Sequence, residues 1–203
     1  ALTPPGAEGG ALRSQSPRRV AGHPVLLGGD VLRVDPATGN GVPGNPMYNS
    51  QNPASNASRI IGYGLRNPFR FTFRPGTSEL WVGDVGWNVW EEVNRMTTPT
   101  PSTAVNFGWP CYEGWVTPNR AQSARQSGYD NANLSLCESL YTAGQSAVAA
   151  PWFFTVDVAE KLAPGAAPAG GLLTAVASRS MPLGVAATGA DDAEGDVAAF
   201  GEL

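Results

Sequence analysis

Four short apolar runs follow one another between Arg59 and Val93, and each ends in a turn-forming segment. The clearest of them, Phe69–Phe73, alternates apolar and polar residues with a period of two. Aromatic and β-branched residues in this pattern, interrupted by Gly, Pro and Asn about every 8–12 residues, predict antiparallel strands rather than helices. The stretch therefore predicts a four-stranded meander, which is about the size of one β-propeller blade. The expected strands are Arg59–Tyr63, Phe69–Phe73, Leu80–Val82 and Trp90–Val93.

The turns of this meander predict where polar groups gather. In an up-and-down sheet, the turns after the first and third strands lie at the same end. Here these turns are residues 65–68 and 84–88, and together they contain a guanidinium, an amide, a carboxylate and glycine-rich backbone. The turn at residues 74–78 lies at the other end and has ordinary hairpin residues. We therefore expect a functional site at the first end.

The segments on either side of the meander differ in pattern. Residues 1–25 are rich in Pro, Gly, Ser and Arg and predict a linker or loop. An alternating strand is expected at Val31–Asp35, and residues 40–58 predict a polar surface loop. Residues 115–137 are polar and turn-like, without a helical stripe.

The composition changes near Pro151. Residues 152–156 have the pattern of one more strand, but the chain beyond them is mainly Ala, Gly and Val without a clear period. Such a segment lacks the apolar area that would offset the entropy lost on ordering. We expect a folded region at residues 26–150 and a low-complexity, disordered tail at residues 151–203.

Composition and charge narrow the class of protein. The 203 residues are 42% hydrophobic and 15% charged, as in a globular protein, and 25 Gly and 18 Pro indicate many loops. A net charge of −4 argues against a nucleic-acid surface, because phosphate binding needs clustered cations. No run resembles a transmembrane helix, and the N-terminus lacks the charged-then-apolar order of a signal peptide.

The two cysteines, Cys111 and Cys137, lie in a turn-rich region. We expect a structural disulfide between them, which would contribute about 3 kcal/mol in the chain-entropy model. The alternative is two unrelated buried thiols in a cytosolic protein.

Two groups of residues could carry chemistry. Arg66-Asn67 precedes a rigid Pro68, and an arginine fork suits carboxylates or quinone oxygens; a surface turn with a structural arginine is the alternative. The second group has oxygen donors that suit calcium, although it lacks EF-hand spacing. Adjacent glutamates on a strand point to opposite faces, so only one of its two can face a site. This second group comprises Asp84, Gly86, Trp87, Asn88, Glu91 and Glu92.

His23 is the single histidine, so an imidazole general base would have to be this residue. It lies in a loop beside Pro24, outside the meander, which favours a solvated loop histidine. The sequence contains no zinc-binding set, nucleotide-binding glycine loop or nucleophile elbow.

The joint order of three motifs resembles the glucose/sorbosone dehydrogenase family, the soluble quinoprotein sugar dehydrogenases. These motifs are GYGLRNPFRFTF, LWVGDVGWNVWEEVN and NFGWPCYEG, and GGDVLRVDPATGNGVPGNP before them fits the same family. The similarity covers roughly Leu26–Tyr141. Taken without the family, Asn106–Gly114 is equally a hydrophobic plug or turn.

The resemblance implies an all-β, six-bladed β-propeller that holds pyrroloquinoline quinone (PQQ) and calcium. Such enzymes oxidise a sugar hydroxyl to a lactone or carbonyl and pass the electrons to an external acceptor. The chain is long enough for a fragment of about two blades, and the resemblance places this partial propeller at residues 26–150. A secreted or periplasmic location is expected, with any leader peptide lying outside this chain.

The resemblance also assigns candidate residues. Arg66 and Asn67 correspond to the pair that contacts the quinone cofactor. Gly86 and Trp87 correspond to positions that present backbone carbonyls to the cofactor's calcium. Glu92 and Phe107 correspond to positions used for a second, structural calcium, where many relatives have tyrosine in place of Phe107.

The chain also departs from the family pattern. The family's catalytic histidine lies in an earlier motif that is absent here, and His23 does not match it. We therefore expect no catalytic residue in this chain and a truncated, catalytically incomplete form of the enzyme. A non-enzymatic β-propeller binding module of an extracellular protein and an unfolded remnant are the alternatives.

Overall fold

The computed structural model describes residues 10–87, 90–116, 122–151 and 153–156, and the chain forms two compact units. The first unit comprises Ala1–Asn67 and Pro99–Ala150, and the second comprises Pro68–Thr98 and Pro151–Leu203. In the described residues, no helix is both long enough and apolar enough to cross a membrane. Most of the predicted tail, residues 157–203, lies outside the described residues.

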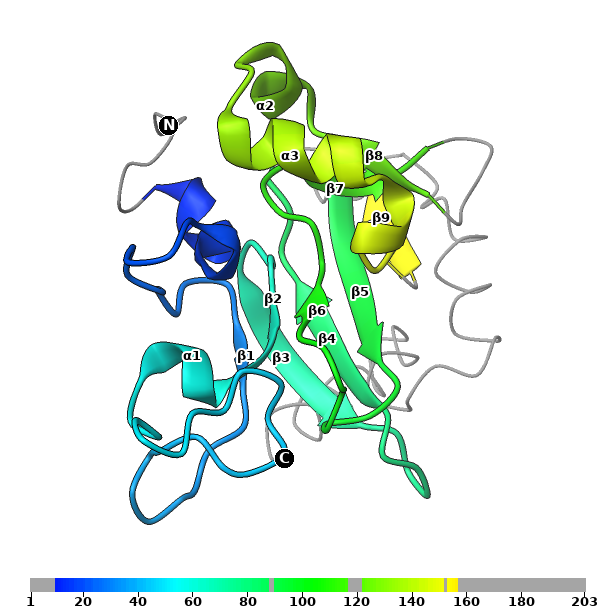
Figure 1. Ribbon diagram of the computed structural model, residues 1–203. Coiled ribbons are helices and arrows are strands. Elements are labelled where there is room, and N and C mark those ends of the chain that lie inside the picture. The colour runs from blue at the N-terminus through cyan, green and yellow to red at the C-terminus, as the bar shows by residue number, and fades with distance from the viewer. Residues whose placement is uncertain (1–9, 88–89, 117–121, 152, 157–203) are drawn as a thin grey trace. The chain divides into compact units, whose positions relative to one another are not determined.

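The second unit contains a four-stranded antiparallel sheet in the order β3-β4-β5-β9 (Figure 1). Three strands of the predicted meander and the strand expected near residue 152 are therefore present, with slightly different ends. The bounds are β3 (Pro68–Phe73), β4 (Leu80–Asp84), β5 (Trp90–Met96) and β9 (Phe153–Val156).

The first strand of the predicted meander belongs to another sheet, so that part of the prediction is wrong. β2 (Ile60–Tyr63) pairs antiparallel with β1 (Val31–Leu32) and parallel with β6 (Val105–Asn106). After β2, Gly64 has a φ of 80° and its carbonyl accepts a 2.8 Å hydrogen bond from the Trp109 N–H. The chain is thus held against the 108–109 segment and does not turn back as a hairpin. Residues 65–68 therefore do not form a hairpin turn of the sheet whose β4–β5 connection contains residues 85–87.

The first unit also contains helices that the sequence pattern did not predict. Residues 11–18 form a 3-10 helix inside the segment expected to be a linker, and Leu12 in it is fully buried. Two short helices also form within and just beyond residues 115–137, where only turns were expected. The chain is therefore built of small, mostly antiparallel sheets together with short helices. The remaining elements of this unit are η1 (Ala11–Arg18), α1 (Asn56–Arg59), β7 (Tyr112–Trp115), β8 (Ser123–Arg125), α2 (Ser127–Asn131), α3 (Ser135–Ala143) and η2 (Gln145–Ala147).

A disulfide between Cys111 and Cys137 lies in the hydrophobic core of the first unit, which confirms the predicted pairing. The Tyr141 hydroxyl donates a 2.8 Å hydrogen bond to the Cys111 carbonyl. The disulfide thus ties the residue just before β7 to α3, and Leu12 of η1 packs in the same core. The core residues are Leu12, Cys111, Tyr112, Tyr129, Leu134, Cys137, Leu140 and Tyr141.

Replacing both cysteines with serine should lower the free energy of unfolding by about 3 kcal/mol, because the disulfide closes a loop with a sequence separation of 26. Urea denaturation of the oxidised protein and of the Cys111→Ser/Cys137→Ser variant measures the difference. Adding reductant should lower the free energy of unfolding of the wild-type protein to about that of the variant. It should not change the stability of the variant. Equal stabilities of the oxidised protein and the variant would contradict the prediction.

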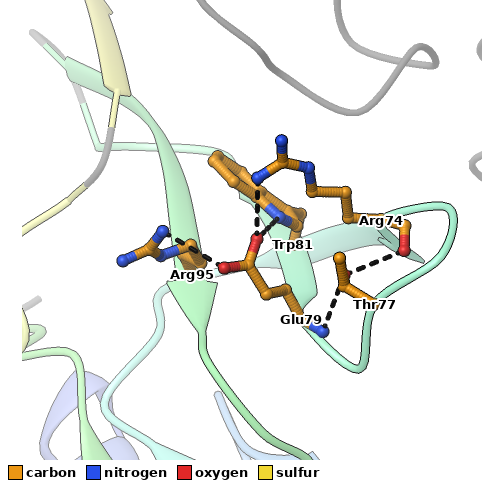
Figure 2. A network of polar contacts seen from close by, with 5 residues as sticks. All are labelled: Arg74, Thr77, Glu79, Trp81 and Arg95. Carbon is orange, nitrogen blue, oxygen red and sulfur yellow. Dashed lines mark hydrogen bonds and ion pairs between the residues drawn. The ribbon is translucent and has the colours of Figure 1, made fainter.

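The β3–β4 hairpin in the second unit is braced by one carboxylate. Figure 2 shows Glu79 between two arginines: its oxygens lie 3.4 Å from Arg74 Nη1 and 3.3 Å from Arg95 Nη1. The Trp81 indole N–H also donates to this carboxylate at 3.4 Å, and the Arg95 guanidinium lies 5.9 Å from the Trp81 ring centroid. The turn at residues 74–78, expected to contain ordinary hairpin residues, therefore connects two strands that share a polar network at this end of the sheet.

Candidate functional site

The Arg66 side chain lies over an aromatic ring of the NFGWP segment. Its guanidinium carbon is 5.8 Å from the centroid of Trp109, within the range of a cation–π interaction. Arg66 is partly buried, Asn67 is exposed and Trp109 is buried. The Asn106–Gly114 segment thus provides the ring on which the Arg66 guanidinium lies. A hydrophobic plug was the alternative interpretation of this segment, and Arg66 is the arginine predicted to contact the cofactor.

Main-chain hydrogen bonds fix the turn that carries Arg66. The Leu65 N–H donates to the Gly29 carbonyl at 3.0 Å, and the Trp109 N–H donates to the Gly64 carbonyl at 2.8 Å. The Phe107 N–H donates to the Tyr63 carbonyl at 2.8 Å. Segments far apart in the sequence therefore hold the turn from both sides.

A buried pair of amides lies behind this turn. Gln15 is fully buried, and its Nε2 donates to Asn106 Oδ1 and to the Trp109 carbonyl, each at 2.8 Å. Asn106 Nδ2 donates back to Gln15 Oε1 at 3.1 Å, and Asn106 Oδ1 also accepts the Gly108 N–H at 2.9 Å. Sequence reasoning missed Gln15, because it lies in a segment without hydrophobic periodicity.

Asp30 is a second residue that sequence reasoning missed. Both carboxylate oxygens are buried, and neither has a hydrogen-bond partner in the described part of the chain. Burial raises the pKa of Asp30 to about 8, so the carboxyl is largely protonated at neutral pH. Burial also raises the pKa of Tyr63; the charge of Arg18 opposes this shift, while that of Asp30 adds to it. The only sequence feature that marks this position is the Gly28-Gly29-Asp30 run before β1.

The second group of candidates belongs to β4, β5 and the loop between them. Glu91 accepts a 3.1 Å hydrogen bond from the Gly86 N–H, so its carboxylate is engaged by the loop. Asp84 and Glu92 are paired across the two strands and are both buried, and Glu92 also accepts from Asn94 Nδ2 at 3.2 Å. These are hard oxygen donors of the kind that calcium binds.

The remaining predicted positions are distributed as follows. Trp87 is 42% exposed, and Asn88 lies outside the described residues. Phe107 is buried and belongs to the first unit with Arg66 and Asn67, whereas Gly86, Trp87 and Glu92 belong to the second.

Two observations concern the metal and the general base. Among the described residues, no three His, Cys, Asp or Glu side chains lie close enough together to hold a metal ion. The calcium candidates Gly86, Trp87 and Phe107 would instead contribute backbone carbonyls, a type of ligand that calcium accepts.

His23 is exposed in a turn, as the sequence favoured, and its backbone N–H donates to the Val20 carbonyl at 3.2 Å.

Comparisons with known proteins point to one family. The Glucose / Sorbosone dehydrogenase family profile matches residues 11–160, which is well over half of the chain. A solved structure, the PQQ-bound form of Aldose Sugar Dehydrogenase from Streptomyces coelicolor, is 31% identical, with a TM-score of 0.34. The similarity covers 43% of this chain and 22% of that one, and no curated protein matches. The chain therefore belongs to the glucose/sorbosone dehydrogenase family.

Proposed function

We propose that this chain contributes a PQQ-binding half-site of a sugar dehydrogenase that oxidises a sugar hydroxyl to a lactone or carbonyl. The observation that carries the proposal is the position of Arg66 over Trp109, within motifs typical of the family. The match to the glucose/sorbosone dehydrogenase family, together with the motifs that resemble soluble quinoprotein sugar dehydrogenases, supports the choice of cofactor. When bound, PQQ would supply the two-electron acceptor for oxidation of the sugar hydroxyl, with an external acceptor as the final oxidant.

The residues of the Arg66 turn suit an anionic quinone. The guanidinium offers a planar fork of donors for carboxylate or quinone oxygens, and stacking on Trp109 limits the orientations that it can adopt. Asn67 is exposed next to it and adds an amide donor and acceptor. Together, the two side chains would bind and orient PQQ.

Calcium belongs to the same proposal. Gly86 and Trp87 would present backbone carbonyls to one calcium ion. Glu92 in the second unit and Phe107 in the first are each proposed separately as a ligand of structural calcium. The hydrogen bond from the Gly86 N–H to the Glu91 carboxylate supports a defined conformation for the loop between β4 and β5. Glu92 contributes a buried carboxylate on β5, the kind of hard oxygen donor that calcium binds.

We further propose that this chain alone turns over very slowly. General acid–base chemistry of the family type needs a histidine near the reacting hydroxyl, and the single histidine, His23, lies in an exposed turn outside the matching motifs. Quinone-dependent dye reduction at rates near those of a full-length relative would contradict this proposal.

A secreted or periplasmic location fits the disulfide, which persists in oxidising compartments.

Replacing Arg66 with alanine should weaken PQQ binding by about 10- to 100-fold, the effect of losing a charge-assisted hydrogen bond of about 1.5–3 kcal/mol. The measurement is a PQQ titration followed by absorbance, with calcium or with chelator, together with a thermal melt. Arg125→Ala is the matched control, because Arg125 also stacks on an aromatic ring of the first unit, 4.3 Å from the Tyr141 centroid. It should leave the affinity unchanged.

The same titration separates the alternatives. Calcium-dependent binding that raises the melting temperature would support the proposal. A cooperative melt unaffected by PQQ would favour a non-enzymatic binding module. The absence of any cooperative melt would identify the chain as an unfolded remnant.

A further inference from the structure

We propose that Gln15 is a positioning residue for Arg66, acting through Asn106 and the backbone of the NFGWP segment. The inference rests on the proposed function, since it concerns how the chain presents Arg66 to PQQ. It adds a residue that lies outside the motifs of the Arg66 turn. Every contact involved is within the first unit.

The first step is the amide pair itself. Gln15 and Asn106 exchange two hydrogen bonds, of 2.8 and 3.1 Å, although they are 91 residues apart in the chain. Gln15 is fully buried and Asn106 is 6% exposed. In such surroundings, removing one partner leaves the other with an unsatisfied polar group, so the pair specifies a single arrangement.

The second step links the pair to the backbone on which Arg66 depends. Gln15 Nε2 also donates to the Trp109 carbonyl at 2.8 Å, and Ser14 Oγ donates to the same oxygen at 2.8 Å. The Trp109 N–H donates to the Gly64 carbonyl at 2.8 Å. The Trp109 peptide is thus held on its carbonyl side by η1 and on its N–H side by the residue two positions before Arg66.

The third step is the close approach at Gly64. A Cβ at this position would lie 2.5 Å from Asn106 Oδ1 and 2.6 Å from Gln15 Nε2. The amide pair therefore fills the space directly against the Arg66 turn. Because the Arg66 guanidinium rests over the Trp109 ring, a shift of the Trp109 peptide would move the surface on which the guanidinium lies.

The test measures affinity and side-chain position separately in the full chain. Gln15→Leu keeps the bulk and removes the hydrogen bonds; we expect it to weaken PQQ binding about tenfold and to change the ring-current shift of the Arg66 Nε–Hε resonance. That resonance is assigned by its loss in Arg66→Lys. Asn106→Asp keeps the acceptor for Gln15 Nε2 but loses the donor to Gln15 Oε1 and buries a charge, so it should change both readouts in the same direction.

Two further variants separate positioning from general destabilisation. Gln145→Leu is a matched control, because Gln145 exchanges hydrogen bonds of 2.9 and 3.0 Å with the backbone of Ser123 in the same unit. It should lower the melting temperature without moving the Arg66 resonance or the PQQ affinity. In the Arg66→Ala background, Gln15→Leu should weaken binding no further, because its effect passes through Arg66.

The outcomes distinguish this inference from the proposed function. An unchanged Arg66 resonance in Gln15→Leu, or a full additional loss of affinity in the double variant, would overturn the inference. Failure of the unchanged protein to bind PQQ would overturn the proposed function, and the Arg66 resonance would then still decide whether Gln15 positions that side chain.

Discussion

Gly64→Ala is expected to lower the free energy of unfolding by about 4 kcal/mol, one of the two largest effects that we expect from a single substitution. Gly64 has a φ of 80°, a left-handed conformation that costs an L-residue about 1–2 kcal/mol. The added Cβ would also lie 2.5 Å from Asn106 Oδ1 and 2.9 Å from the Gly108 nitrogen. Overpacking of this kind adds about 1–3 kcal/mol, and a disrupted buried hydrogen bond adds about 1 kcal/mol or more.

Gly39→Ala provides a matched control for the Gly64 variant. Gly39 has a φ of 70° and also belongs to the first unit, but nothing lies within 4 Å of the position that a Cβ would occupy there. Its substitution should therefore cost only the backbone term of about 1–2 kcal/mol. Urea denaturation of both variants measures the difference, and equal losses would show that the space around Gly64 is not restrictive. Gly64→Ala should also weaken PQQ binding, because Gly64 lies two residues before Arg66 in the same turn.

The local pattern of apolar and polar residues predicted where strands form, but it did not predict which strands pair with one another. The alternation in Phe69–Phe73 and the turn at residues 74–78 predicted the β3–β4 hairpin, because hairpin pairing depends on neighbouring residues. β2 has an equally clear apolar pattern, but it pairs with strands that lie well before and well after it in the chain. Pairing at that separation depends on contacts such as Trp109 N–H to Gly64 carbonyl, which no local pattern encodes.

The same distinction applies to the candidate site. Arg66 and the aromatic NFGWP segment could be selected from their residue types, whereas the stacking of Arg66 on Trp109 joins residues that are far apart in the sequence. Gln15 was missed because η1 is stabilised by tertiary packing of Leu12 in the core, not by a periodic hydrophobic face. Its burial, not its sequence context, distinguishes this amide from an ordinary surface glutamine.

Asp30→Asn is expected to make the protein more stable at alkaline pH and to remove much of the pH dependence between pH 5 and pH 9. The folded chain raises the pKa of Asp30 from 3.8 to about 8, because both oxygens are buried without a hydrogen-bond partner in the described residues. Between these values, the unfolded chain has lost the proton and the folded chain retains it. The contribution of this group to stability is therefore fully present below about pH 4 and is lost as the pH rises through 8.

The size of the stability loss follows from the difference between the pKa of Asp30 in the folded chain and in the unfolded chain. Each pKa unit corresponds to about 1.4 kcal/mol, and partial solvent access to Asp30 reduces the total to on the order of 4 kcal/mol. Urea denaturation at intervals between pH 5 and pH 9 should show the unchanged protein losing stability relative to Asp30→Asn. Asp35→Asn is the control, since hydrogen bonds from the Thr38 and Ala37 backbone lower the pKa of this exposed carboxyl, and its effect should appear only at acid pH. Parallel profiles for the wild-type protein and Asp30→Asn would mean that the carboxyl is already charged in the folded chain at pH 5, which would contradict the prediction.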